Sequence, residues 1–585
     1  RVLWGKNSRG VGGANGLNGD KRIEVAYYDI ASGKVSPIAD ATPAVKWVPA
    51  AKPAPAAKQP AARKKAAAAR VQTVNLPKIV VDAKGNPWLA TRRYIGVNWK
   101  IVLTKFDRAE DRWTQPVTLA NSTFSQDRRC SAARDANGRL WFAWPSDLRT
   151  TKKALISGVY VAEVDPSAEI PLAATKPPKA AVAPKLPEPR WGDDTPDRAR
   201  ADHHTWSTGG ETYELYWGDF HRHTDISNCI TPHDGCIVEQ FRYAYDIAKL
   251  DLLGTSDHTD IGKPYDPYEW WCNQKLADVF FVPDFFTSMY VYEREQRWPW
   301  GHRNVIFAER GGPIVYIKRA LYKSMPWHAT LPAADGGAEI LPQEVWKILG
   351  KSGMDLSIIS HTGATGMGTD WDGYDGIDNA VENLVEIYQG ARVSYEGIGA
   401  PQPTVGFPRS RQLKPDAHGS VQTGRDFGQF NKGVYQQALK NGYKLGVFAN
   451  SDHISTHTSF GGVYVKSFTR HGILEGLNAR RTIAGTDKIF IDFSCNGHPM
   501  GEVFDTSDKP ELKVSVEGTA PLTAVTILRN EVNIRRFTPE DTKQFETTFT
   551  DDAPIDGENR YYVRVEQADG SIGWASPVWV TFEEK

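Results

Sequence analysis

Hydrophobic and polar positions change their pattern twice along the chain. Up to about residue 165, short runs such as residues 21–30 (KRIEVAYYDI) alternate apolar and polar residues, which predicts β-strands. Between residues 210 and 499, short apolar runs alternate with amphipathic stretches, as expected for strands followed by helices. From residue 500 to 585 short alternating strands return. We therefore expect a β-rich region at 1–165, an α/β domain at 210–499 and a small antiparallel β-sandwich at 500–585.

Two stretches rich in proline and alanine have no apolar periodicity. They are residues 41–70, inside the β-rich region, and residues 166–209, before the α/β domain. Repeated proline favours extended chain over packed structure. We expect both stretches to be linkers.

The β-rich region contains a weak internal repeat. The sequence Asp82-Ala-Lys-Gly-Asn-Pro-Trp88 returns as Asp135-Ala-Asn-Gly-Arg-Leu-Trp141. Each copy is a polar glycine turn followed by an aromatic strand, which is typical of a β-hairpin. A period of roughly 50 residues suits one blade of a β-propeller. Only two or three such units are visible, so the region is either propeller-like with few blades or a smaller β module.

The α/β domain contains repeated strand and helix signals. The strands are expected at 215–221, 252–256, 285–292, 304–308, 356–360, 384–388, 445–449 and 489–493. The helices are expected at 238–249, 343–351, 433–441 and 469–481. Repeated βα units indicate a parallel sheet, either open or closed into a barrel of the TIM-like kind.

Residues of metal-ligating types fall at the ends of these expected strands, where βα barrels build active sites. They are His221 and His223, Asp257 and His258, Glu293, His302, His361, and Asp452 and His453. Because side chains alternate along a strand, the two histidines of an HxH sequence share one face. Each cluster alone is commonly a turn, a cap or a buried structural histidine. Together they form a mixed nitrogen and oxygen set that suits Zn, Mn or Fe.

The order of these clusters resembles the PHP superfamily, named for polymerase and histidinol phosphatase. Within this superfamily, the chain is similar to an uncharacterised branch that carries a C-terminal β domain. This closer similarity rests on the segments GDFHRHTD, SDHTD, GHRN, SHTGATGMGTDW, VEIYQG and NSDH. It covers about residues 210–585 and is specific over 210–500. It implies a distorted (β/α)7 barrel that holds two or three divalent ions.

The resemblance also implies roles for individual residues. His221, His223, Glu293 and Asp452 would hold a first metal ion. Glu293 would bridge to a second ion, which His302 and His361 would also bind, and His258 and His453 would belong to a third. A further ligand of the third ion is usual five or six residues after the HxH sequence, where this chain has Asn228 and Cys229. Cys229 could bind as a thiolate, unless it pairs with Cys236.

These residues suggest hydrolysis. Divalent ions lower the pKa of bound water and so supply hydroxide, which would attack an ester or phosphorus centre. Arg222 and Arg303 flank ligands and could bind an anionic group, although Arg222 could instead form a salt bridge on the other face of its strand. Asp257 would orient His258, and His457 is a candidate pocket residue.

Three functions remain open at this point. The first is a metal-dependent phosphoesterase, by analogy with PHP relatives. The second is a metallohydrolase of a non-phosphate ester, an amide or a glycan. The third is a non-catalytic interaction protein that contains metal.

Composition narrows the partners of the protein. The chain has 70 Lys and Arg against 70 Asp and Glu, so its formal net charge is zero, and we expect no nucleic acid partner. We expect the substrate to be a small or polymeric anion. No stretch approaches the roughly 20 apolar residues of a membrane span. The start at Arg1 and the 19 Trp and 22 Tyr residues favour a processed protein of the periplasm or the extracellular space.

Overall fold

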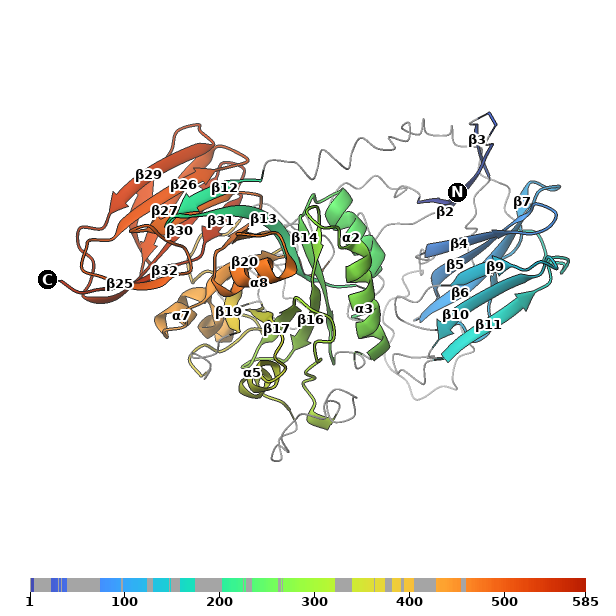
Figure 1. Cartoon of the computed structure of the whole chain (residues 1–585), viewed down its shortest axis with the longest axis horizontal. Helices are drawn as coiled ribbons and strands as arrows, with labels where there is room; N and C mark the ends of the chain where they lie inside the picture. Colours follow the sequence, from blue (N-terminus) through green and yellow to red (C-terminus); the bar gives the residue numbers. More distant parts are fainter. Residues whose placement is uncertain are drawn as a thin grey trace, which may run out of the picture. The chain divides into compact units, whose positions relative to one another are not determined.

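The computed structural model (Figure 1) divides the chain into two compact units. The first comprises Arg1–Trp191 with Thr231–His233, and the second comprises Gly192–Ile230 with Asp234–Lys585. The structure describes residues 2–4, 23–38, 74–173, 203–320 and 339–584, except 30, 33, 96–97, 124–129, 147, 149–157, 225, 228–233, 261–264, 266, 362, 374–380, 391–393, 404–427 and 454–458. The expected linker at 41–70 lies outside the described residues, as does most of the one at 166–209.

The first unit consists of antiparallel sheets of three, five and three strands. The first sheet contains β1 (Val2–Trp4), β2 (Ile23–Tyr28) and β3 (Val35–Pro37). The second contains β4 (Val74–Val81), β5 (Pro87–Ile95), β6 (Asn98–Asp107), β7 (Arg112–Trp113) and β8 (Val117–Thr118). The third contains β9 (Ser131–Arg134), β10 (Leu140–Ser146) and β11 (Gly158–Val164). One core cluster joins the second and third sheets, through Trp88, Trp99 and Phe142 among others.

The internal repeat builds the same turn twice. In the first copy, Asp82 Oδ1 accepts hydrogen bonds from the backbone N–H groups of Lys84 and Asn86, each at 2.9 Å, and Oδ2 accepts one from Trp88 Nε1 at 3.2 Å. In the second copy, Asp135 makes the corresponding bonds, including one of 3.0 Å from Trp141 Nε1. The turn signal in the sequence is therefore confirmed at both positions.

The second unit contains a sheet of seventeen strands and a sheet of four. The large sheet contains, in order, β12 (Thr205–Thr208), β13 (Glu211–Arg222), β14 (Leu252–His258), β15 (Thr287–Ser288), β16 (Tyr290–Glu295), β17 (His302–Phe307), β18 (Leu356–Ser360), β19 (Glu382–Gln389), β20 (Gly446–Asn450), β21 (Phe460–Val465), β22 (Thr482–Gly485), β25 (Val503–Thr506), β27 (Leu522–Arg529), β28 (Val532–Phe537), β30 (Gly557–Gln567), β31 (Ile572–Ala575) and β32 (Val578–Phe582). The small sheet contains β24 (His498–Pro499), β23 (Phe490–Cys495), β26 (Glu511–Glu517) and β29 (Gln544–Thr550).

Strand directions within the large sheet are mixed. β13, β14 and β16 run parallel to one another, and so do β18, β19 and β20. Between these two groups, β17 pairs in antiparallel fashion with both β16 and β18. β13 also pairs with β21 in antiparallel fashion, and an isolated parallel bridge joins Arg222 to Asp452. The ends of β13 and β20 are therefore neighbours.

The expected α/β fold with a distorted (β/α)7 barrel, and with it the TIM-like barrel, is wrong. Of the residues that the structure describes, 46% lie in strands and 14% in helices, and the described strands form several sheets and no barrel. The antiparallel β16 and β17 follow each other along the chain with no described helix between them, and the large sheet continues from β22 into the C-terminal strands. Apolar runs in the sequence marked the strands, but they did not specify the partners of each strand.

The predicted helices agree with the structure better than the predicted fold class does. All four expected helices are present, as α2 (Ile237–Asp246), α5 (Pro342–Gly350), α7 (Tyr435–Lys440) and α8 (Arg470–Asn478). A fifth helix, α3 (Pro267–Phe280), was not predicted. Its apolar residues are not confined to one face, since Trp270 is buried whereas Trp271 is 48% exposed. None of the helices in the described part of the chain is long and apolar enough to cross a membrane.

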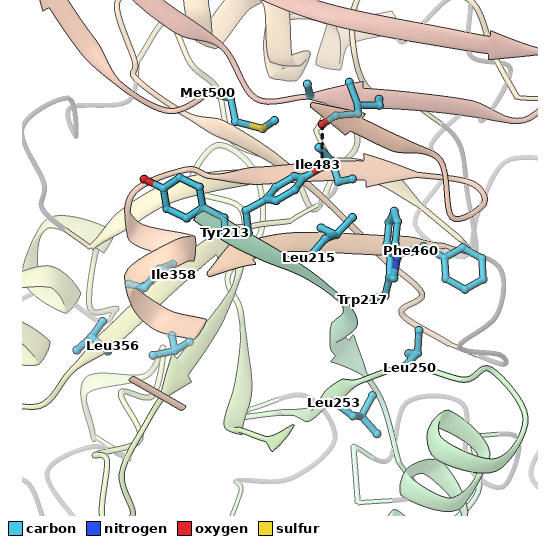
Figure 2. Close-up of a cluster of buried hydrophobic side chains, with 14 of the residues drawn as sticks. Tyr213, Leu215, Trp217, Leu250, Leu253, Leu356, Ile358, Phe460, Ile483 and Met500 are labelled. Atoms are coloured by element: carbon cyan, nitrogen blue, oxygen red, sulfur yellow. Dashed lines mark hydrogen bonds between the residues drawn. The ribbon is translucent and has the colours of Figure 1, made fainter. Parts of the chain in front are cut away.

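A shared core joins the strands around the histidines to the C-terminal strands (Figure 2). Tyr213, Leu215 and Trp217 lie on β13 and belong to the same buried cluster as Ile483 of β22 and Met500. Backbone pairing adds to this link because β22 pairs with β31. The elements that carry the metal-ligating residues therefore rest on a core to which the C-terminal region contributes.

Candidate metal centre

Eight of the residues predicted to bind metal converge at one place. They form four overlapping groups, in each of which one nitrogen or oxygen atom per residue lies within 4.8 Å of the others. These groups are His221, His361 and Asp452; His221, His223 and Glu293; His223, Asp452 and His453; and His258, Glu293 and His302. Most of these residues lie at or just beyond the ends of β13, β14, β17, β18 and β20, and Glu293 lies within β16. The strand ends thus gather although the strands form no barrel.

Glu293 lies at the middle of the cluster and is fully buried. Its Oε1 atom lies 2.7 Å from His302 Nδ1 and 3.2 Å from His361 Nε2. Its Oε2 atom lies 2.8 Å from His258 Nε2 and 3.0 Å from His223 Nε2. A third imidazole, that of His221, lies 3.4 Å from Oε2. The two oxygens therefore face different imidazoles, which is the arrangement expected of a carboxylate between two ion positions.

Asp452 supplies the second carboxylate of the cluster. Its Oδ1 atom lies 2.9 Å from His223 Nε2, 3.1 Å from His453 Nε2 and 3.5 Å from His221 Nε2. The backbone of Asp452 has a φ of 63°, a left-handed conformation that costs of order 1 kcal/mol or more outside glycine. Its N–H donates to the His221 carbonyl at 2.7 Å, and its carbonyl accepts from His223 N–H at 3.2 Å. These bonds to β13 hold the strained residue in place.

Burial and mutual charge shift the pKa values of the cluster in opposite directions. Burial raises the pKa of Glu293, but His258, His221 and other imidazoles outweigh burial and hold that pKa well below its usual range. Burial lowers the pKa of His221, but Glu386, Glu293 and Asp452 raise it to about 10. Burial and the neighbouring His221 hold the pKa of His361 well below its usual range. Binding of cations would displace protons from this cluster.

The donor set fits divalent cations. Glu293 Oε2 is buried and makes no hydrogen bond within the described part of the chain, although His258, His223 and His221 place ring nitrogens 2.8–3.4 Å from it. Nitrogen atoms that crowd an oxygen in this way could act with it as ligands of one shared cation. Imidazole with carboxylate suits Zn, Mn or Fe.

Three polar residues that support the cluster were not predicted from the sequence. Glu386 Oε1 lies 2.8 Å from His221 Nδ1, and Asp234 Oδ2 lies 3.0 Å from His453 Nδ1. Ser227 Oγ lies 2.6 Å from Nδ1 of His223. Glu386 belongs to the VEIYQG sequence, where an acidic residue within an apolar strand was the available signal. Asp234 and Ser227 had no comparable signal, because both lie in polar loop sequence.

Asp257 is placed differently from its expected role beside the His258 ring. Its carboxylate accepts hydrogen bonds from the N–H and hydroxyl groups of both Thr224 and Ser227, at 2.8–3.1 Å. Because Ser227 Oγ also bonds to His223, Asp257 supports His223 through that hydroxyl. Its link to His258 is indirect, since His258 N–H bonds to Ser227 Oγ at 3.2 Å.

The two arginines beside the ligands are buried and bonded to other parts of the protein. Arg222 Nε donates to Gln240 at 2.7 Å, and Nη1 donates to the Asp452 carbonyl at 3.0 Å. Arg303 Nε donates to both carboxylate oxygens of Glu382 at 3.1 Å. His457, Asn228 and Cys229 lie outside the described residues, so the predictions for these three residues remain predictions.

Comparisons with known proteins add relatives but no activity. No protein-family profile matches the chain. A protein of Chlamydia trachomatis is 29% identical over 219 residues, and one of Chlamydia muridarum is 28% identical over 245 residues; both are described only as uncharacterized. These matches cover 34% and 38% of each chain, so the chain spans little more than a third of the length of these relatives.

One solved structure is also similar to part of the chain. It is a fibronectin(III)-like module of Clostridium thermocellum CbhA, with 13% identity and a TM-score of 0.12, and the match covers 16% of this chain and 96% of the module. At that score the likeness carries no argument about the fold.

Proposed function

We propose that the protein is a metal-dependent hydrolase that uses two or three divalent ions of Zn, Mn or Fe, and that its substrates are phosphoesters. The observation that supports this most is the position of Glu293. Its two oxygens face different histidines, and those histidines come from separate strands. A structural salt bridge does not require six imidazoles around two buried carboxylates.

The bound ions would supply a nucleophile from water near neutral pH and would offset developing negative charge. The chain's own part is to hold the ligands rigidly and to leave one side open. His258 and His453 are 7% and 9% exposed, whereas His221 and His223 are fully buried. Substrate would therefore approach from the side of His258 and His453.

The phosphoester class follows from the resemblance of residues 210–500 to the PHP superfamily. A cluster that binds several cations attracts anionic substrates, which agrees with this class. Arg222 and Arg303 have no part in this proposal, because both guanidinium groups are buried against Gln240, Glu382 and backbone carbonyls.

Elemental analysis combined with a substrate panel tests the proposal. The panel contains p-nitrophenyl phosphate mono- and diesters and p-nitrophenyl carboxyl esters, each with and without EDTA. We expect bound metal and EDTA-sensitive release of p-nitrophenol from a phosphate ester. Hydrolysis of carboxyl esters alone would favour a non-phosphate substrate, and bound metal without hydrolysis of any ester would favour a non-catalytic interaction protein. A protein that binds no metal would contradict the proposal.

Two substitutions test the site itself. His221→Ala and Glu293→Ala each remove a predicted ligand, and we expect the hydrolysis rate to fall by at least about 1,000-fold, with less bound metal. His471→Ala is the matched control, because His471 lies in the same unit but is exposed and bonds to Asp355. Wild-type rates in both ligand variants would contradict the site assignment.

A further inference from the structure

A further buried carboxylate, outside the cluster itself, lies on the side of the His221 ring that faces away from the other candidate ligands. Glu386, on β19, is fully buried. Its Oε1 atom lies 2.8 Å from His221 Nδ1 and accepts a hydrogen bond from Asn450 Nδ2, also at 2.8 Å. Its Oε2 atom accepts from Gln389 Nε2 at 3.3 Å. Asn450 is fixed in turn, because its Oδ1 accepts from Phe220 N–H at 2.8 Å.

The two nitrogens of His221 face opposite partners. Nε2 points to the cluster, 3.2 Å from His223 Nε2, 3.4 Å from Glu293 Oε2 and 3.5 Å from Asp452 Oδ1. Nδ1 points away from the cluster, to Glu386. A neutral imidazole carries its proton on one nitrogen only, so a proton held on Nδ1 leaves the Nε2 lone pair for a cation.

We infer that Glu386 is a positioning residue that accepts a hydrogen bond from Nδ1–H of His221 and thereby fixes the ring with Nε2 toward the metal ions. This inference rests on the proposed metal site. Glu386 is not itself a ligand, because its carboxylate lies on the Nδ1 side of the ring. Asn450 and Gln389 hold that carboxylate from both oxygens, so it cannot turn away without breaking two hydrogen bonds.

The same arrangement occurs at a second histidine of the cluster. His453 directs Nδ1 to Asp234 Oδ2 at 3.0 Å and Nε2 to Asp452 Oδ1 at 3.1 Å. Outer carboxylates of this kind orient metal-binding histidines, and their loss typically lowers metal affinity by about 10- to 100-fold. Glu386 is the better test of the two, because His221 lies closer to the bridging Glu293.

The variant Glu386→Gln removes the charge at nearly constant volume. We expect its affinity for Mn²⁺, measured from the free Mn²⁺ signal in electron paramagnetic resonance, to fall by about 10- to 100-fold. The visible spectrum of the Co²⁺-loaded protein should also change, because one ligand is no longer held in place. Glu396→Gln is the control: Glu396 is also a buried carboxylate, but it bonds to Arg564, Tyr562 and Trp574. It should keep wild-type Mn²⁺ affinity.

A second variant covers the case in which Glu386→Gln does not fold. Glu386→Asp keeps the buried charge but is one methylene too short for Nδ1, so Mn²⁺ affinity should fall several-fold while the melting temperature stays near that of wild type. Unchanged affinity and an unchanged Co²⁺ spectrum in the folded variants would overturn the inference. Wild-type protein that binds no Mn²⁺ or Co²⁺ would instead overturn the proposed function, so the two failures can be distinguished.

Discussion

The two units of the chain bury carboxylates in opposite ways. In the first unit, Asp82 is satisfied by groups no more than six residues away along the chain. In the second unit, Glu293 lies among imidazoles from strands spread over the sequence, and the pair of His221 and Glu386 spans 165 residues. The first carboxylate builds a turn from its own surroundings. The second depends on the folding of the whole unit.

This difference distinguishes a carboxylate that stabilises local structure from one that would serve function. A carboxylate that neighbouring N–H groups satisfy needs no ion and stabilises the turn that contains it. A carboxylate oxygen that ring nitrogens surround without a hydrogen bond, like Glu293 Oε2, would be stabilised by a cation shared with those nitrogens.

Metal should stabilise the second unit alone. With free Mn²⁺ at about 1,000 times its dissociation constant, one filled site adds about 4 kcal/mol to the free energy of unfolding. Differential scanning calorimetry with Mn²⁺ and with EDTA should show one transition that moves and one that does not. In Glu293→Ala neither transition should move; equal shifts of both transitions in wild type would contradict the contrast.

The buried turn of the first unit should depend strongly on Asp82. Asp82→Ala leaves the indole N–H of the fully buried Trp88 without its acceptor, and we expect a loss of about 2 kcal/mol in the free energy of unfolding of that unit. Asp135→Ala makes the same change in the more exposed copy, so its effect should be smaller. Urea unfolding followed by tryptophan fluorescence measures both, and a larger loss in Asp135→Ala would contradict the prediction.

The glycines of the two turns should cost less to replace. Gly138 has a φ of 83°, and a Cβ atom there would lie 3.8 Å from Ala83, so Gly138→Ala should cost only the backbone strain of about 1 kcal/mol. Gly85→Ala should cost somewhat more, because its Cβ would lie 2.8 Å from Arg108 Nη1. The same urea titration ranks the pair, and the reverse order would count against this account.

The smallest expected effect is the response of the first unit to acid. Burial raises the pKa of Asp82, but hydrogen bonds from Asn86, Trp88 and Lys84 outweigh burial and lower it below its usual value. A lowered pKa in the folded state adds stability that is present above the unfolded pKa of about 3.9 and is lost as pH falls through the folded value. Between pH 6 and pH 3, Asp82→Asn should therefore lose less stability than wild type.

Sequence reasoning succeeded where the cause was local. The turns at Asp82 and Asp135 and the helix α8, which Thr469 caps by accepting from Gly472 N–H, follow from residues close in the chain. The residues of the candidate metal centre were found because most of them lie at or near a strand end. Strand partners could not be read in this way, and hence the barrel prediction was wrong. Glu386 was missed because only its distant partner reveals its role.

The pairing of β22 with β31 has a consequence for synthesis of the chain. All the ligand residues leave the ribosome before residues 572–576, yet Ser576 bonds to Val447 N–H at 2.9 Å and to the Thr482 carbonyl at 3.0 Å, beside the strand that leads to Asp452. Until residues 572–576 emerge, the edge of β22 that pairs with β31 stays open, and nascent chains can aggregate there. The large sheet is therefore completed only after a segment about 90 residues beyond β22 has been made.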